Sequence, residues 1–224
     1  MSPGPLLPLL LSLKVAAGAT AIILPPGVAL GWLLARRAVR GRSVLETLTA
    51  LPLILPPTAI GYLLLRLLSR DGLLGERTLG FDPGLLLTWK AAAAASAIMA
   101  LPLVARTARL AFERVDPRLE ALARTLGLGP WSAFLGVTLP LARPGLLAAA
   151  ILGFGRALGE FGATVIVAGN IPGRTQTLAL AIFSDMQIGH DREAMVLVGI
   201  TTALAFAAIW CVEALLRPGR RSSR

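Results

Sequence analysis

Long apolar runs separated by short polar segments dominate the chain. Five of these runs approach the ~20 residues that an α-helix needs to cross a hydrocarbon layer about 30 Å thick. We therefore predict five membrane-spanning helices, at residues 9–35, 44–68, 85–105, 141–168 and 194–216. Together they predict an all-α membrane protein that forms a single domain over residues 1–224.

Several of the predicted spans contain proline. Pro25-Pro26 lie in the first, Pro52 and Pro56-Pro57 in the second, and Pro102 in the third. Proline breaks helices in water, but membrane helices tolerate it because neighbouring helices can bond the freed carbonyl groups. These prolines could produce kinks that serve packing alone, or kinks that also shape a path through the membrane.

The composition agrees with a membrane protein. Hydrophobic residues make up 55% of the chain and charged residues only 15%, against about 25% charged residues in an ordinary soluble domain. The net charge of +10 could indicate nucleic-acid binding. However, the basic residues fall between the apolar runs with little aromatic interleaving, so we expect a lipid bilayer as the partner and no nucleic acid.

The polar loops alternate between basic and mixed. The basic segments hold Arg36, Arg37, Arg40 and Arg42 after the first span, Arg106, Arg109, Arg114, Arg118, Arg124 and Arg143 after the third, and Arg217, Arg220, Arg221 and Arg224 at the end. The loops at 69–84 and 170–193 have more acidic than basic residues. Because an excess of Lys and Arg marks the cytoplasmic side, the alternation predicts an N-terminus outside and a C-terminus in the cytoplasm.

The longest basic segment, residues 106–140, is too polar to span a membrane. Leu119, Leu122, Ala123 and Leu126 recur in it at helical spacing, which predicts a short amphipathic helix that Gly127 ends. Its apolar face could pack on the ends of the chain's own helices. It could equally occupy a groove on a soluble partner.

The same segment resembles the cytoplasmic loop of the permease subunits of binding-protein-dependent ABC importers. That loop carries Glu-Ala-Ala, three residues, Gly, nine residues and Ile-x-Leu-Pro. Here Ala121-Leu122-Ala123, Gly127 and Val137-x-Leu139-Pro140 follow the spacing, although Glu120 stands one place early. The resemblance implies a coupling helix at about 118–127, in which Glu120, Ala121, Leu122, Ala123, Leu126 and Gly127 dock on a cytoplasmic ATPase.

Chemistry for ATP hydrolysis is absent from the sequence. It contains no Gly-x4-Gly-Lys-Ser/Thr match, and no cluster of cysteine, histidine or carboxylate residues suggests a metal or catalytic site. We therefore expect no cofactor in this chain and no enzyme activity of its own. In the resembling importers a separate subunit binds the ATP.

Two charged residues stand inside the fourth predicted span. Arg156 and Glu160 are four residues apart, which permits an ion pair on one helix face. Charges inside a membrane are costly unless they pair or face a wet cavity. The pair could brace the helix bundle, or it could form part of a translocation path or gate together with the hydroxyl of Thr164.

The stretch from Arg156 to Thr177 resembles the molybdate permeases, with the sulfate and thiosulfate permeases as relatives. This resemblance implies a multi-pass protein of a bacterial or archaeal cytoplasmic membrane that works as a homodimer. Two ATPase subunits and an external oxyanion-binding protein would complete the importer. Molybdate is the expected cargo, with tungstate beside it and sulfate as the alternative. An ion-coupled secondary transporter, the alternative of another class, fits five spans without internal repeats poorly.

Overall fold

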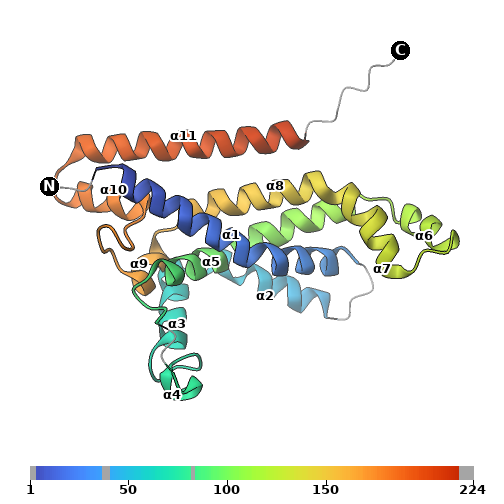
Figure 1. Ribbon diagram of the computed structural model, residues 1–224, viewed down its shortest axis with the longest axis horizontal. Helices are drawn as coiled ribbons and strands as arrows, with labels where there is room; N and C mark the ends of the chain where they lie inside the picture. The colour runs from blue at the N-terminus through green and yellow to red at the C-terminus, as the bar shows by residue number, and fades with distance from the viewer. Residues whose placement is uncertain (1–3, 37–40, 82–83, 217–224) are drawn as a thin grey trace, which may run out of the picture.

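The computed structural model describes residues 4–36, 41–81 and 84–216, and every regular element in these ranges is a helix, as predicted (Figure 1). The elements are α1 (Leu6–Ala35), α2 (Arg42–Ile54), α3 (Pro57–Leu68), α4 (Glu76–Leu79), α5 (Trp89–Glu113), α6 (Pro117–Thr125), α7 (Pro130–Ala133), the π-helical turn η1 (Phe134–Thr138), α8 (Leu139–Leu158), α9 (Gly162–Ala168), α10 (Leu178–Gln187) and α11 (Asp191–Leu216). Of the charged residues used to predict the topology, Arg37, Arg40, Asp82, Arg217, Arg220, Arg221 and Arg224 lie outside the described residues.

Four helical segments are long and apolar enough to cross a membrane. They are α1, α5, α11 and the stretch Pro130–Leu158, which joins α7, η1 and α8 into one segment. A fifth crossing exists only if α2 and α3, which meet at an angle of 107°, count as one broken span. The structure thus supports four or five crossings, where the sequence predicted five.

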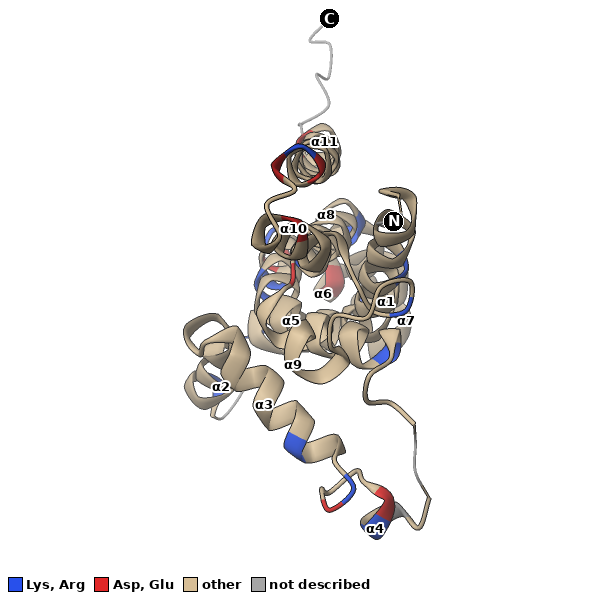
Figure 2. Ribbon diagram, turned by 90° about the vertical axis from the view of Figure 1, so that its left-hand side faces the viewer, with Lys and Arg blue, Asp and Glu red and all other residues tan. Residues whose placement is uncertain are grey.

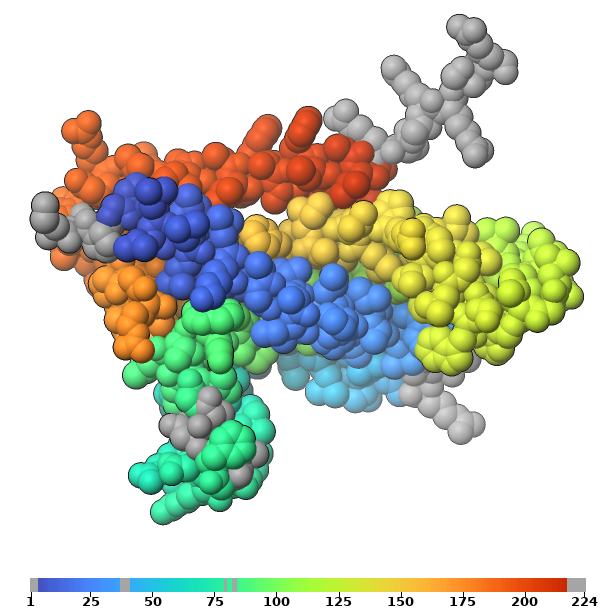
Figure 3. All heavy atoms as spheres, viewed as in Figure 1, coloured from blue at the N-terminus to red at the C-terminus, as the bar shows by residue number. Residues whose placement is uncertain are grey.

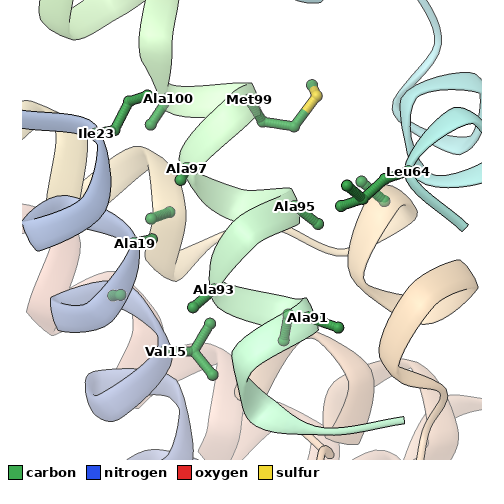
Figure 4. Close-up of a cluster of buried hydrophobic side chains, with 14 of the residues drawn as sticks. Val15, Ala19, Ile23, Leu64, Ala91, Ala93, Ala95, Ala97, Met99 and Ala100 are labelled. Atoms are coloured by element: carbon green, nitrogen blue, oxygen red, sulfur yellow. The ribbon is translucent and has the colours of Figure 1, made fainter. Parts of the chain in front are cut away.

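The alanine-rich helix α5 forms the centre of the bundle. Its buried alanines lie between α1 on one side and α3 with α9 on the other, and Figure 4 shows Ala93 and Ala97 facing α1 while Ala95 faces Leu64 of α3. Close approach of α1 needs glycine, because a β-carbon at Gly31 would lie 2.7 Å from Cβ of Ala108. Small residues allow such backbone contact between membrane helices, where no hydrophobic effect drives association.

The contacts of α5 also set the directions of its neighbours. Gly18 lies against Trp89 and Gly27 against Val104, so α1 runs parallel to α5. Gly145 lies against Ala111, and a β-carbon at Gly153 would lie 2.6 Å from Val104, so α8 runs antiparallel to α5. These relative directions fit alternating crossings when α2 and α3 together cross once between α1 and α5. We refer below to the α6 end and the α10 end of the bundle (Figure 1).

The second predicted span, 44–68, is not one helix. It breaks after Ile54, where Leu55 and Pro56 adopt extended backbone conformations, and α3 then leaves the bundle. The cause is the Pro56-Pro57 pair: neither residue has an N–H to donate, and a proline restricts the residue before it to extended conformations. In Figure 3, α3 and α4 project from the body of the molecule as an arm.

The fourth predicted span, 141–168, also differs from the structure. Its helix starts earlier, at Pro130, and ends at Leu158, and residues 162–168 form the separate helix α9. Gly159 ends α8, and the carboxylate of Glu160 accepts a hydrogen bond from the backbone N–H of Ala163 at the start of α9. The other predicted spans keep their places, although α5 continues to Glu113.

The remaining elements lie at the edges of the bundle. Cys211 is exposed on α11, and the apolar helix α10 precedes α11. Figure 2 shows acidic and basic residues together on α4 and on the first turn of α11.

Replacing Gly31 by alanine should destabilise the fold by about 1–3 kcal/mol, because the added methyl group would overpack the contact between α1 and α5. Gly155→Ala is the matched control, since a β-carbon there would lie 4.0 Å from Cβ of Ala208, an ordinary contact. Thermal unfolding of the detergent-purified protein, followed by size-exclusion chromatography, measures both. A Gly31→Ala protein as stable as the Gly155→Ala protein would contradict the packing described here.

Candidate functional site

Arg156 and Glu160 form the ion pair that their spacing permits. Nη1 of Arg156 lies 2.8 Å from Oε2 of Glu160, and the second carboxylate oxygen, Oε1, accepts the N–H of Ala163 at 3.0 Å. The Glu160 side chain is 2% exposed and that of Arg156 is 32% exposed. The carboxylate is therefore fully engaged inside the protein, whereas part of the guanidinium reaches the surface of this chain.

The helix packing sets the position of this pair along the bundle. Continuing the antiparallel register of α8 beyond Gly153 brings its end, Leu158, level with about Ile98 of α5. That position is roughly 14 Å along α5 from Trp89, at a rise of about 1.5 Å per residue. With Trp89 taken as one edge of a hydrocarbon layer about 30 Å thick, the break between α8 and α9 falls near the middle of that layer.

The break between α2 and α3 lies at the same place. A β-carbon at Gly162 would lie 2.9 Å from Cβ of Pro57, and one at Gly61 would lie 2.9 Å from the carbonyl oxygen of Ala163. The first residues of α3 and α9 are therefore in contact, and the two helices continue side by side. In secondary transporters, interrupted helices that meet near the membrane midplane form the substrate site, which shows that membrane proteins can use such breaks to bind a solute.

Thr164 was predicted to take part in a path or gate, and the structure places it inside α9. Its side chain is fully buried, and its hydroxyl has no hydrogen-bond partner among the described residues. Thr58, which the sequence did not single out, follows the other break and is exposed. The contact between the breaks brings Gly162, two residues after Glu160, against Pro57 and the backbone of Thr58, whereas Thr164 is buried.

A second candidate region lies at the α6 end. The predicted amphipathic helix forms as α6, whose N-terminus is capped by Asp116 and whose C-terminus is followed by Gly127 with φ of +94°. Glycine suits that left-handed conformation. Leu122 is 59% exposed and Leu126 is 78% exposed, so the apolar face is not covered by the chain's own helices. Ala123, by contrast, is buried.

Glu120 points in the opposite direction from these leucines. Its Oε2 accepts a hydrogen bond from the hydroxyl of Thr138 at 3.1 Å, and its Oε1 lies 3.6 Å from Nη2 of Arg36. Glu120 also lines a cleft of about 1070 Å³ together with Trp32, Arg109 and other residues of α1, α5 and α6. Within the predicted coupling segment, leucines and glutamate therefore serve different surfaces.

An ion-pair network that sequence reasoning missed joins α2 to α5 beside this cleft. Glu46 pairs with Arg42 and with Arg109 at 2.8 and 2.7 Å, and Glu113 pairs with Arg109 at 2.7 Å and with Arg42 at 4.0 Å. The i,i+4 spacing of Arg42 with Glu46 and of Arg109 with Glu113 was the available signal. The contact between the two pairs depends on tertiary packing, which the sequence does not display.

Comparison with known proteins identifies relatives over almost the whole chain. The sequence profile of the family described as binding-protein-dependent transport system inner membrane component matches residues 27–221. The molybdenum transport system permease protein ModB of Escherichia coli K12 is 43% identical over 213 residues, 94% of this chain and 93% of that protein. The sulfate transport system permease protein CysT of the same strain is 36% identical over 196 residues, 87% of this chain and 71% of that protein.

A solved structure supports the fold. The MetNI methionine ABC transporter, in inward-facing conformations, superposes with a TM-score of 0.64 and 20% sequence identity, covering 96% of this chain and 95% of that chain. At this identity the likeness concerns the fold alone.

Arg156→Ala should cost about 3–5 kcal/mol, because it leaves the buried carboxylate of Glu160 without its cation. The double variant Arg156→Ala/Glu160→Ala should be more stable than this single variant, since it removes the unpaired charge. Arg143→Ala, at an exposed arginine with no ion pair in the described structure, is the control. Yield and thermal stability in detergent measure all three. If the single and double variants are equally stable, the pair does not support the fold.

Proposed function

The chain belongs to the family of binding-protein-dependent transport system inner membrane components, and we propose that it is the membrane-spanning subunit of an ATP-driven importer for molybdate. The observation that carries this proposal is the 43% identity with a molybdenum permease over nearly the full length of both proteins. The relatives are permease components and not catalytic subunits. ATP hydrolysis therefore belongs to a separate subunit of the transporter.

Sulfate is the second candidate cargo, because a sulfate permease is 36% identical over most of this chain. Molybdate, tungstate and sulfate are all tetrahedral dianions, so the permease needs only to pass an anion of that shape. Selection among them would rest mainly on the external binding protein. An ion-coupled secondary transporter, the alternative of another class, has no support in the family match.

The proposed partners are a second copy of this chain, two cytoplasmic ATPase subunits and an external oxyanion-binding protein. The exposed leucines of α6 supply an apolar surface suited to a groove on each ATPase. Ile54 at the end of α2 and Tyr62 and Leu63 on α3 are exposed. Lipid or the second copy would cover this apolar surface. A homodimer gives the two breaks near the midplane a central position between the copies.

The proposed orientation puts the α6 end in the cytoplasm of a bacterium or archaeon. The N-terminus would then lie outside, and α11 would end inside. The described arginines at this end, among them Arg36, Arg42 and Arg109, support it through the usual excess of basic residues on the cytoplasmic side. ATPase docking on α6 requires the same orientation.

The proposed translocation path passes the break that holds Arg156 and Glu160. In this conformation the guanidinium is neutralised by Glu160, so an oxyanion finds no free positive charge there. Movement of α8 relative to α9 would lengthen this ion pair and expose the cation to the cargo. We assign Thr164 to the wall behind this gate, where its hydroxyl lies buried in α9.

Reconstitution tests the proposed function directly. The chain, its ATPase and its binding protein are placed in liposomes, and ATP hydrolysis is measured with binding protein loaded with molybdate, with sulfate, or unloaded. Molybdate-loaded binding protein should stimulate hydrolysis most. Stimulation by sulfate alone would change the assigned cargo, and oxyanion uptake driven by an ion gradient without ATP would reject the importer.

Charge on the outward face of α6 should abolish ATPase docking. Leu122→Glu and Leu126→Glu each place a carboxylate in the proposed apolar contact, where it would be desolvated without a partner. We expect membrane insertion at normal yield and loss of the ATPase from the purified complex. Ser132→Glu, at an exposed position of α7, is the control for added charge at this end. Full copurification of the ATPase with both leucine variants would refute the docking surface.

A further inference from the structure

The helix α6 has two faces with different contacts. Leu119, Leu122 and Leu126 point away from the chain, whereas Glu120 and Ala123 turn toward it. Glu120 stands one place earlier than the acid of the Glu-Ala-Ala pattern, and a shift of one residue rotates a side chain by about 100° around a helix. Glu120 is thereby directed to the membrane helices and not to the side that the leucines occupy.

Every polar contact that α6 makes with a membrane-crossing segment in the described structure passes through Glu120. One carboxylate oxygen accepts from Thr138 of η1, and the other lies beside Arg36 at the end of α1. The remaining hydrogen bonds of α6 stay within the helix and its caps. One side chain thus connects the docking helix to two different helices of the bundle.

Thr138 lies directly before the long helix α8. It is the last residue of η1, and Leu139 continues directly into α8, which extends for 20 residues to Leu158. At about 1.5 Å per residue this helix is roughly 30 Å long, and it carries Arg156 at its far end. A displacement of Thr138 along the helix axis therefore reaches the ion pair at the membrane midplane.

The π-helical turn η1 adds a second feature. Single π-turns inside α-helices often occur at functional sites, and η1 lies between the short helix α7 and the long helix α8. Trp32, Trp131 and Phe134 pack around it, with ring centroids 5.2 to 6.3 Å apart. The turn is thus held on one side by aromatic packing and on the other by Glu120.

We propose that Glu120 is a positioning residue that transmits movement of α6 to α8, and that it does so through Thr138 with Arg36 as the counter-charge. This inference rests on the proposed function and deepens it. ATPase subunits would move α6 through its leucines, and the Glu120–Thr138 hydrogen bond would make the start of α8 follow. The far end of α8 would then change the Arg156–Glu160 contact.

The decisive variant is Thr138→Val, which removes the hydroxyl donor and keeps the side-chain shape. Thr47→Val is the matched control, because the Thr47 hydroxyl bonds only the carbonyl of Ser43 within its own helix. The complete transporter in liposomes is assayed for ATPase copurification and for the number of ATP molecules hydrolysed per molybdate imported. We expect the ATPase to copurify fully with Thr138→Val and the ratio of ATP hydrolysed to molybdate imported to rise about tenfold. Tenfold is about the change in an equilibrium constant that the loss of one hydrogen bond to a carboxylate causes.

Exchanging the charges of Arg36 and Glu120 distinguishes a positioning role of Glu120 from a general contribution to stability. Arg36→Glu and Glu120→Arg should each raise the ratio of ATP to molybdate, and the double variant should bring it back toward the wild-type value. A purely structural role would lower the yield of transporter without changing this ratio. Copurification of the ATPase is recorded in parallel for each variant.

The outcomes distinguish the inference from the function on which it rests. If the wild-type transporter is active and Thr138→Val leaves the ratio of ATP hydrolysed to molybdate imported unchanged, the inference alone is overturned. The inference alone is also overturned if the Glu120→Arg complex loses the ATPase and the Arg36→Glu/Glu120→Arg double variant does not regain it. A wild-type transporter that shows no stimulated hydrolysis with any oxyanion rejects the proposed function, and the inference falls with it.

Discussion

The lack of water inside a bilayer is the constraint on which this structure depends. Backbone N–H and C=O groups that are not bonded within the protein are costly there, so a chain can cross only as helices unless an interruption is sheltered by protein. The breaks at Leu55–Pro56 and Gly159–Phe161 satisfy this condition by lying against each other, with Pro57 in contact with Gly162. Glu160 bonds one of the N–H groups that the second break exposes. Interruptions inside a bilayer are costly, and their pairing supports the proposed path between them.

The long helix α8 links this midplane site to the surface at the α6 end. Its close contacts with α5 through Gly145 and Gly153 fix its direction, and Thr138, directly before its first residue, bonds Glu120 of α6. The docking helix α6 is separate from this helical segment, and the contact of Glu120 with Thr138 connects it to the helix that carries Arg156. The separation of the leucine face from Glu120 on α6 allows one short helix to contact a soluble partner and the membrane helices at the same time.

The sequence predicted the helical class, the positions of most crossings and the amphipathic helix α6, because apolar run length and helical periodicity are local properties. The i,i+4 spacing of Arg156 and Glu160 permitted an ion pair and left open whether it forms. The resemblance to molybdate-type permeases is confirmed by the comparisons. The break at Pro56-Pro57 was missed because proline is tolerated in many membrane helices, and the break after Gly159 was missed because a glycine inside an apolar run does not by itself end a helix. Their contact through Pro57 and Gly162 depends on tertiary packing. The roles of Thr58 and Thr138, and the network of Arg42, Glu46, Arg109 and Glu113, depend on partners far away in the sequence, which no local pattern reveals.

In the proposed importer the paired breaks line a path whose accessibility changes with the state of the ATPase. Thiol labelling tests it directly in a Thr58→Cys variant that also carries Cys211→Ser, because Thr58 is exposed at the first break. The complete transporter in liposomes is treated from outside with a membrane-impermeant maleimide, with and without trapped ATP. The account predicts that the labelling rate at position 58 changes between the two states. Equal labelling in both states, with transport intact, would contradict it.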